Sequence, residues 1–318
     1  MPRTIELQSG TAANIQKPKQ ESGHKVVDKT QKIIQVFGVL LTGLISLFCI
    51  LPFVLIISSS FTAEKSITLH GFSLFPREFS LDAYDLIFQN PRMVLGSYAV
   101  TIGLTITGTL IGLFIIAMTG YALQRPDFLL RNHISFYIYF TTLFSGGLIP
   151  FYMMVTRTLK LKDSYLAVLL PLMMSPWLII LMKNFLKSIP HSITESATID
   201  GANDFYIFIK IILPTATPAL ATVGLFLALS YWNEWYNSML FLSSRVEYRP
   251  LQLFLYNTVN EAKYIRDSAA ASNIPAIEIP LESMKMATAV VATGPVIFIY
   301  PFVQKYFIQG ITVGAVKG

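Results

Sequence analysis

Ionisable residues are scarce in this chain. Asp, Glu, Lys and Arg make up 13% of its 318 residues, whereas hydrophobic residues make up 53%. Soluble domains carry about 25% charged residues, so this composition excludes a soluble enzyme, a nucleic-acid reader and a secreted disulfide scaffold. Cysteine is nearly absent as well. Because Cys49 stands alone, no intrachain disulfide is possible and redox chemistry is disfavoured.

The lack of charge is sharpest in six apolar stretches, which contain no Asp, Glu, Lys, Arg or His. A bilayer core of about 30 Å requires about 20 helical residues for each crossing. The sequence therefore predicts an all-α polytopic membrane protein with six transmembrane helices. These cover residues 33–58, 94–123, 134–155, 165–182, 215–233 and 286–303. Prolines in them invite kinks, at Pro52, Pro150, Pro171, Pro176, Pro295 and Pro301.

The same absence limits the mechanism. Ion-coupled transporters usually carry ionisable groups at membrane depth, and membrane-bound enzymes need acids or metal ligands for their chemistry. A phosphate-binding loop is excluded too, since the dipeptide Gly-Lys never occurs. The sequence therefore favours a transport component that is energised by another chain. The alternatives are a stand-alone secondary transporter or channel, and a membrane-bound transferase.

Lysine placement predicts the orientation. Residues 1–32 are polar and predict a cytoplasmic tail, followed by a transmembrane domain over residues 33–318. Positively charged segments beside a span resist translocation, so both ends of a six-span chain are expected in the cytoplasm. The lysines of the tail stand at positions 17, 19, 25, 29 and 32. They also suit contact with anionic lipid.

The segment 183–214 predicts two short helices joined by a sharp turn. Ser192 and Glu195 have the spacing of a capping box, which predicts a helix start. Gly201 suits a left-handed helix end. Asn203 or Asp204 is expected to cap a second helix, which should stop before Pro214.

This loop resembles a known family. Glu195, Ala197, Gly201, Ile211, Leu213 and Pro214 match the E-A-A-x-x-x-G signature and its I-x-L-P ending. That signature is found in membrane subunits of binding-protein-dependent ABC importers. Ser196 departs from it, since the signature has alanine there. Residues 230–235 and 300–318 resemble the maltose-permease G-like carbohydrate branch, and residues 278–287 resemble its LplC/YtcP-type members, which are associated with oligosaccharides and polysaccharides.

The resemblance implies the type I ABC importer permease fold in a bacterial inner membrane. The expected partners are a second homologous permease, two ABC ATPase subunits that bind ATP and Mg, and an extracytoplasmic solute-binding protein. No cofactor, metal, catalytic residue or nucleic acid is expected in this chain. Glu195 would anchor the coupling loop, Ala197 would pack against the ATPase and Gly201 would make the bend. The expected coupling residues are Glu195, Ser196, Ala197, Asp200, Gly201, Ala202 and Pro214.

Polar and aromatic residues of the middle spans are candidates for the substrate path: Tyr137, Tyr139, Thr141, Thr142, Ser145, Tyr152, Tyr231, Trp232 and Asn233. Aromatic residues near the end of the fifth span, among them Trp235, suit either a sugar ring or the interfacial belt of a membrane protein. The segment 237–284 is expected to contact a solute-binding protein or to rest on the membrane. Gly108 and Gly112 have the GxxxG spacing that allows close helix approach.

Overall fold

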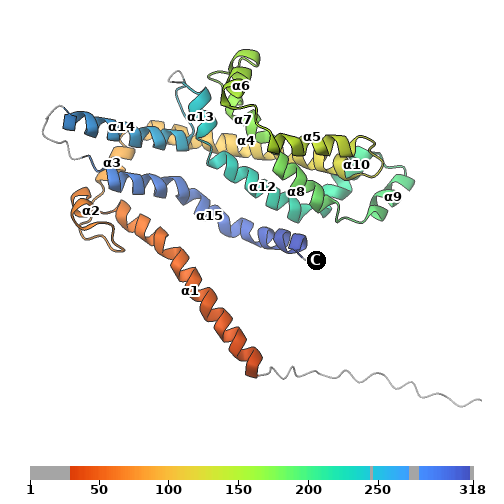
Figure 1. Cartoon of the computed structure of the whole chain (residues 1–318), viewed down its shortest axis with the longest axis horizontal. Coiled ribbons are helices and arrows are strands. Elements are labelled where there is room, and N and C mark those ends of the chain that lie inside the picture. Colours follow the sequence, from red (N-terminus) through yellow and green to blue (C-terminus); the bar gives the residue numbers. More distant parts are fainter. Residues whose placement is uncertain (1–28, 244–245, 272–278, 316–318) are drawn as a thin grey trace, which may run out of the picture. The chain divides into compact units, whose positions relative to one another are not determined.

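The structure is a computed structural model that describes residues 29–243, 246–271 and 279–315 (Figure 1). Contacts divide the chain into two units, Met1–Leu51 and Pro52–Gly318, and each is described by itself. Most of the polar tail predicted over residues 1–32 lies outside the described residues, as do Glu278 and residues 316–318.

The regular secondary structure of the described residues is helical, apart from an isolated β-bridge between Thr62 and Phe79. This confirms the predicted all-α class. The helices are α1 (Lys29–Ser60), α2 (Glu64–His70), α3 (Asp82–Ile87), α4 (Pro91–Gln124), α5 (Arg131–Leu143), α6 (Leu148–Met153), η1 (Met154–Thr158), α7 (Leu166–Met173), α8 (Pro176–Leu186), α9 (His191–Ile199), α10 (Asp204–Ile207), η2 (Phe208–Ile212), α11 (Leu213–Thr215), α12 (Thr217–Trp232), α13 (Tyr236–Phe241), α14 (Leu251–Ala271) and α15 (Leu281–Ala315). The elements η1 and η2 are π-helical.

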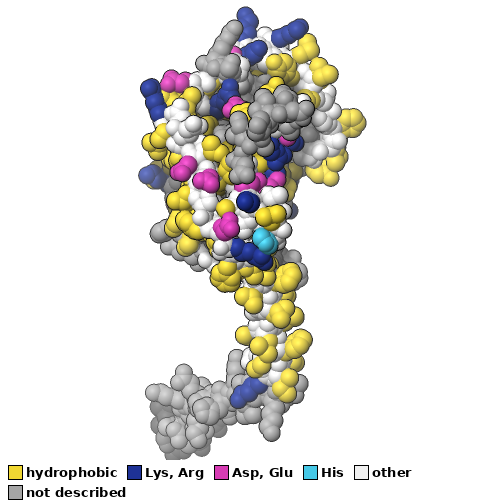
Figure 2. Space-filling view, turned by 90° about the vertical axis from the view of Figure 1, so that its left-hand side faces the viewer, with side chains coloured by type: hydrophobic (Ala, Val, Ile, Leu, Met, Phe, Trp, Pro, Cys, Tyr) yellow, Lys and Arg dark blue, Asp and Glu magenta, His cyan; other side chains and the backbone are white. Residues whose placement is uncertain are grey.

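Helix α1 is the element that crosses the boundary between the two units. Its residues 32–51 are all exposed, and most of their side chains are hydrophobic (Figure 2). The stretch Lys32–Ser60 is 29 residues long, which suffices to cross a bilayer. A helix that is apolar all round requires lipid or protein as cover.

Three helices are each long and apolar enough to span a membrane: Lys32–Ser60, Pro91–Gln124 and Leu281–Ile299. Three bent helix pairs pass the same test together. They are Arg131–Leu143 with Leu148–Thr158, Leu166–Met173 with Pro176–Leu186, and Asp204–Thr215 with Thr217–Trp232. By length and composition the described residues thus supply up to six spans, the predicted number, if each bent pair crosses as one.

The sharpest bend differs from the proline-based prediction. The axes of Arg131–Leu143 and Leu148–Thr158 meet at 114°, and the break falls before Pro150. Gly147 adopts a φ of +89° there, a conformation that suits glycine because it has no Cβ atom. Pro52, Pro171, Pro295 and Pro301 lie inside unbroken helices. The sharpest turn thus depends on glycine, whereas the 41° bend between α7 and α8 falls directly before Pro176, where a proline kink was predicted.

Helix α4 forms the centre of the core of the second unit, where it packs against α7, α8 and α12. Its glycines permit the close approach. A Cβ atom on Gly108 would lie 2.3 Å from the ring of Tyr231, and one on Gly112 would lie 2.9 Å from the backbone oxygen of Met173. The GxxxG pair thus packs helices within this chain.

Helices α9 and α10 lie at one end of the second unit, whereas α2, α3 and much of α14 lie towards the other (Figure 1). At that other end α15 packs against α2, α3 and α14. The carboxylate of Glu64 accepts hydrogen bonds from the backbone N–H groups of Glu282 and Ser283, each at 3.0 Å. This satisfies donors at the start of α15. Acidic and basic side chains are mixed on this end (Figure 2).

Candidate functional site

The loop between α8 and α12 begins with the short helix α9. It starts at His191, after Pro190, and no side chain caps its first turn. The capping box predicted for Ser192 and Glu195 is therefore wrong, because Ser192 already lies inside the helix. Glu195 instead bonds with His191 one turn earlier, with 2.9 Å between Oε1 and Nδ1.

The end of α9 confirms the predicted glycine turn. Gly201 has a φ of +83°. Its N–H donates to the carbonyl of Thr198, and the N–H of Ala202 donates to the carbonyl of Ala197, both at 3.0 Å. This hydrogen-bond pair is the Schellman motif, which satisfies the last carbonyls of a helix. The turn is therefore fixed by backbone bonds and by glycine at position 201.

The second helix starts as predicted but runs further. The side chain of Asn203 accepts a hydrogen bond from the N–H of Tyr206 at 2.8 Å and so caps α10. The predicted stop before Pro214 is wrong, because the helix continues through η2 and α11 to Thr215. Pro214 lies inside this continuous helix, one residue before its end. Beyond Thr215 the chain bends by 84° into α12.

The two faces of α9 differ in exposure. Thr194 and Ala197 are buried against the chain's own core. The opposite face presents Glu195, Ser196 and Asp200 to solvent, together with Ile199, whose exposed fraction is 86%. Ala197 thus differs from the expectation that it packs against an ATPase, since its methyl group already contacts its own subunit. The exposed face is the part that a partner can reach.

Aromatic packing attaches the loop to α4. The ring of Phe208, in η2, stacks on Tyr121 with 5.4 Å between centroids and meets Phe114 edge-on at 5.9 Å. Phe208 is 1% exposed. Such aromatic pairs add to the stabilisation that comes from burial. These contacts hold η2, and α10 before it, against α4.

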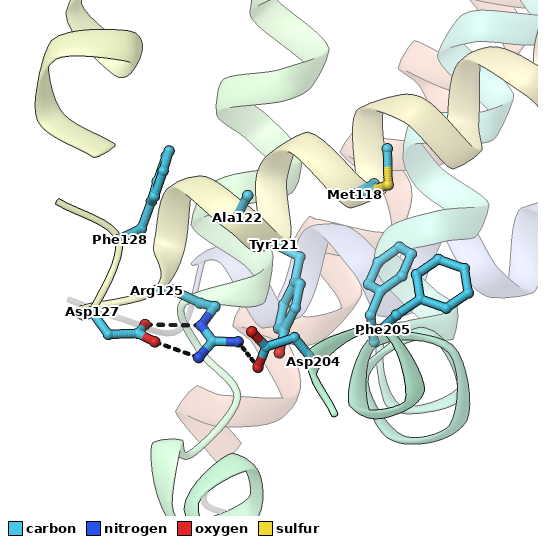
Figure 3. A pocket seen from close by; sticks show the side chains of 9 residues that line it. Met118, Tyr121, Ala122, Arg125, Asp127, Phe128, Asp204 and Phe205 are labelled. Carbon is cyan, nitrogen blue, oxygen red and sulfur yellow. Dashed lines mark hydrogen bonds and ion pairs between the residues drawn. The ribbon is translucent and has the colours of Figure 1, made fainter. Parts of the chain in front are cut away.

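An arginine clamp joins the same elements (Figure 3). Arg125, directly after α4, bonds to both carboxylate oxygens of Asp127, with 2.8 Å between Nε and Oδ1. Another nitrogen of its guanidinium pairs with Asp204, the first residue of α10. The hydrogen bonds to Asp127 raise the pKa of Arg125, and Arg125 lowers the pKa of Asp127. Asp127 thus stays ionised beside a fixed cation.

This clamp was missed by the sequence prediction, because Arg125 and Asp204 lie 79 residues apart. The one available signal was Asp127, two residues after Arg125 at the end of a predicted span. A pocket of about 390 Å³ opens beside the clamp, lined on its apolar side by Met118, Phe128 and Phe205 (Figure 3). The loop, the clamp and this pocket form one site at the same end of the second unit.

The residues predicted for the substrate path fall into two groups. Tyr137, Tyr139, Thr141, Thr142 and Ser145 are exposed, on α5 or directly after it. Tyr231 and Trp232 are buried instead. The hydroxyl of Tyr231 donates to the carbonyl of Leu169 at 2.7 Å, and Nε1 of Trp232 donates to the carbonyl of Ala292 at 3.0 Å.

The remaining two candidates are fixed in different ways. Tyr152 stacks on Phe241 with 5.9 Å between ring centroids. Asn233 is exposed, and its side-chain amide donates to the carbonyl of Leu229 at 3.0 Å. Within the described ranges, no three His, Cys, Asp or Glu side chains group together as a metal site.

The structure is thus that of an all-helical membrane protein with a short surface helix held between two candidate spans. Residues 126–313 match the binding-protein-dependent transport system inner membrane components, and the chain belongs to that family. It is a multi-pass inner-membrane permease subunit of an ABC importer, in the carbohydrate branch. Such subunits lack ATPase activity and need no cofactor, and the family implies ATPase and binding-protein partners.

Relatives cover nearly the whole chain. It is 40% identical to YtcP of Bacillus subtilis (strain 168), a polygalacturonan/rhamnogalacturonan transport system permease protein, over 89% of this chain and 99% of YtcP. Identity to LplC of the same organism is 35%, over 91% of this chain and 97% of LplC. A solved bacterial ABC transporter involved in importing the acidic polysaccharide alginate matches with a TM-score of 0.72 and 33% identity, over 88% of this chain and 98% of that one.

Proposed function

We propose that this chain forms the translocation path for an acidic oligosaccharide or polysaccharide fragment, together with a second homologous permease. ATP-driven closure of two ABC ATPase subunits would move it through the loop at residues 190–214. Both termini of the permease would lie in the cytoplasm. The observation that carries this proposal is α9, a helix packed on its own core by one face and exposed on the other.

The chemistry of the exposed face suits a protein partner. Ile199, on α9, and Phe205, on α10, are large apolar residues with exposed fractions of 86% and 62%, and Glu195 and Asp200 are exposed charged residues of the same loop. Apolar anchors inside a charged rim are typical of protein interfaces. The Schellman turn and the clamp hold this face in one orientation, so that a push on it reaches α4 and α12.

Two observations favour an acidic saccharide. YtcP bears a name that specifies polygalacturonan and rhamnogalacturonan, and the solved transporter imports alginate, described as an acidic polysaccharide. Both resemble this chain over most of its length. The spans as predicted contain no acidic residue that would repel such a substrate.

The decisive experiment measures uptake and ATP hydrolysis by the full transporter in proteoliposomes. We expect Glu195→Lys and Gly201→Asp each to abolish uptake of labelled trigalacturonate while hydrolysis continues. Glu195→Lys reverses charge on the docking face, and Gly201→Asp adds a Cβ atom at a φ of +83°. The control is Glu78→Lys, the same charge change at an exposed residue between α2 and α3. Wild-type uptake by both loop variants would contradict the proposed coupling.

Cross-linking tests the contact itself. Cys49 is the single native cysteine, so a Cys49→Ser background accepts one reporter thiol. We expect Ser196→Cys, on the exposed face of α9, to cross-link to an ATPase subunit. Thr68→Cys, at an exposed position of α2, should not. Equal cross-linking at both positions would contradict specific docking of α9.

A further inference from the structure

A second pocket lies at the opposite end of α12 from the coupling loop. Its volume is about 470 Å³, and it is bounded by the residues that follow α12, by α14 and by α15. The bond from Nε1 of Trp232 to the carbonyl of Ala292 ties α12 to α15 here. Small side chains at Ala289 and Ala292 leave the space open. The pocket is therefore held by contacts between three helices.

Two aromatic rings form one wall. Trp235 and Tyr256 lie with 5.1 Å between their ring centroids and 33° between their planes. Their exposed fractions are 40% and 44%, so each keeps a free surface. Aromatic residues that are apolar on the face and polar at the tip are also usual at a membrane interface. A pair that lines a pocket with hydrogen-bonding groups does more, since the CH face of a sugar ring packs against such a surface.

The other walls supply the polar groups that saccharides require. Gln252 and Asn260 bring amides, which both donate and accept hydrogen bonds, and Thr288 brings a hydroxyl. Nε2 of Gln252 lies 3.4 Å from Oδ1 of Asn233, which links the pocket to a residue predicted for the substrate path. Hydroxyl-rich ligands are recognised by amides in this way, because each amide can pair with two hydroxyls.

Lys285 gives the pocket its charge. Among the described residues it is the one charged side chain of the lining, which contains no carboxylate. Its ammonium bonds to Glu282 with 2.7 Å between Nζ and Oε1, and 42% of the lysine side chain is exposed. An ammonium has three donors, so further donors can pair with the carboxylate of a ligand. Charge-assisted bonds of this kind are roughly twice as strong as neutral ones.

We propose that this pocket binds one uronate ring of the transported saccharide, with Trp235 and Tyr256 against the ring and Lys285 on its carboxylate. The inference rests on the proposed function and names a site for its substrate. A bound uronate would lie at the end of the second unit away from α9, where sugar enters if α9 faces the cytoplasm.

The experiment compares two probes in one reaction. Proteoliposomes with the full transporter and its binding protein receive trigalacturonate and its methyl ester, each with a different label. The ester keeps the rings and loses the negative charges. Because the binding protein is the same for every variant, a change in the ratio of acid to ester uptake reports on the permease.

We expect Lys285→Gln to lower the acid-to-ester ratio about tenfold, the discrimination that one charge-assisted bond provides. Trp235→Leu and Tyr256→Leu should lower uptake of both probes about equally, and Trp235→Phe should restore much of it. The matched control is Lys263→Gln, an exposed lysine on α14 outside the pocket, which should keep the wild-type ratio. Glu282→Gln should keep or raise the ratio, because it releases the ammonium.

The failures are distinguishable. If wild-type protein imports trigalacturonate and Lys285→Gln keeps the wild-type ratio, the pocket assignment is overturned and the proposed function stands. If Trp235→Leu leaves uptake of both probes unchanged, the aromatic wall is not a sugar contact. If wild-type protein imports neither probe but takes up a neutral arabinooligosaccharide, the acidic substrate is overturned, and the uronate site with it.

Discussion

Helices α4 and α5 follow each other in the chain and pack together, yet they differ in what covers them. α4 buries a row of side chains and glycines that includes Gly108, Gly112 and Tyr121. None of the 13 residues of α5 is buried. The difference shows that α4 is fixed by its own chain, whereas α5 depends on lipid or on a second subunit for cover.

The largest effect should come from overpacking α4. Gly112→Leu places a side chain where a Cβ atom already lies 2.8 Å from Leu227 and 2.9 Å from the backbone oxygen of Met173. Overpacking typically costs about 1–3 kcal/mol. Because a backbone atom moves aside less easily than a side chain, we expect the free energy of unfolding to fall by on the order of 3 kcal/mol. Thermal unfolding of the purified transporter in detergent measures it.

The matched control lies on the same helix. A Cβ atom on Gly103 meets nothing within 4 Å. Gly103→Leu should therefore leave the unfolding temperature unchanged or raise it slightly, since leucine favours helix. Equal destabilisation by the two substitutions would show that α4 is not packed as described.

The next effect should come from the arginine clamp. Arg125→Ala removes the bonds to Asp127 and Asp204 that hold the end of α4 to the start of α10. We expect uptake to fall about fivefold, which corresponds to a loss of interaction free energy on the order of 1 kcal/mol. ATP hydrolysis should be retained. Arg125→Lys should restore part of the uptake, because lysine keeps the charge but not the two-pronged geometry. Unchanged uptake in Arg125→Ala would remove the clamp from the coupling path.

Substitutions on α5 should affect stability less, and they test what covers this helix. Tyr137→Ala and Thr141→Ala truncate exposed side chains, so unfolding should change by less than about 0.5 kcal/mol. If these residues line the path with a second permease, uptake should nonetheless fall about threefold, because each variant loses one contact with the substrate. Wild-type uptake in both variants would mean that lipid alone covers this face.

The smallest effect is the pH dependence of the clamp. The hydrogen bonds from Arg125 lower the pKa of Asp127, so the folded chain releases this proton more readily than the unfolded chain does. The stabilisation is complete above the ordinary Asp pKa of about 3.9 and is lost as pH falls through the lowered value. The difference in unfolding temperature between wild type and Asp127→Asn should shrink below about pH 4. A difference that grows on acidification would contradict this assignment.

Local signals predicted much of the coupling loop. Gly201 was identified, and the cap was narrowed to Asn203 or Asp204, because a left-handed turn and a side-chain cap depend on residues only a few positions away. The capping-box prediction was wrong although it, too, used only neighbouring residues. Ser192 and Glu195 have the correct spacing, but the helix begins at His191 after Pro190, and spacing does not fix the starting residue.

Long-range contacts were beyond the sequence. The pairing of Arg125 with Asp204 and the stacking of Phe208 on Tyr121 join segments that are far apart in the chain. A kink in the span 134–155 was predicted at Pro150, but its size of 114° and its position at residues 144–147 were not, since hydrophobicity describes the segment as one continuous span. Apolar length predicts how much membrane a segment can cross, whereas its path depends on what packs against it.

The bend after Thr215 has a mechanical consequence. The segment Asp204–Thr215 meets α12 at 84°, and its 12 residues would extend about 18 Å at the rise of an α-helix. Under the proposed coupling, this segment would act as a lever on the N-terminal end of α12. A small sideways displacement at Gly201 would exert a torque on α12 rather than a push along its axis. We therefore expect α12 to tilt in each transport cycle.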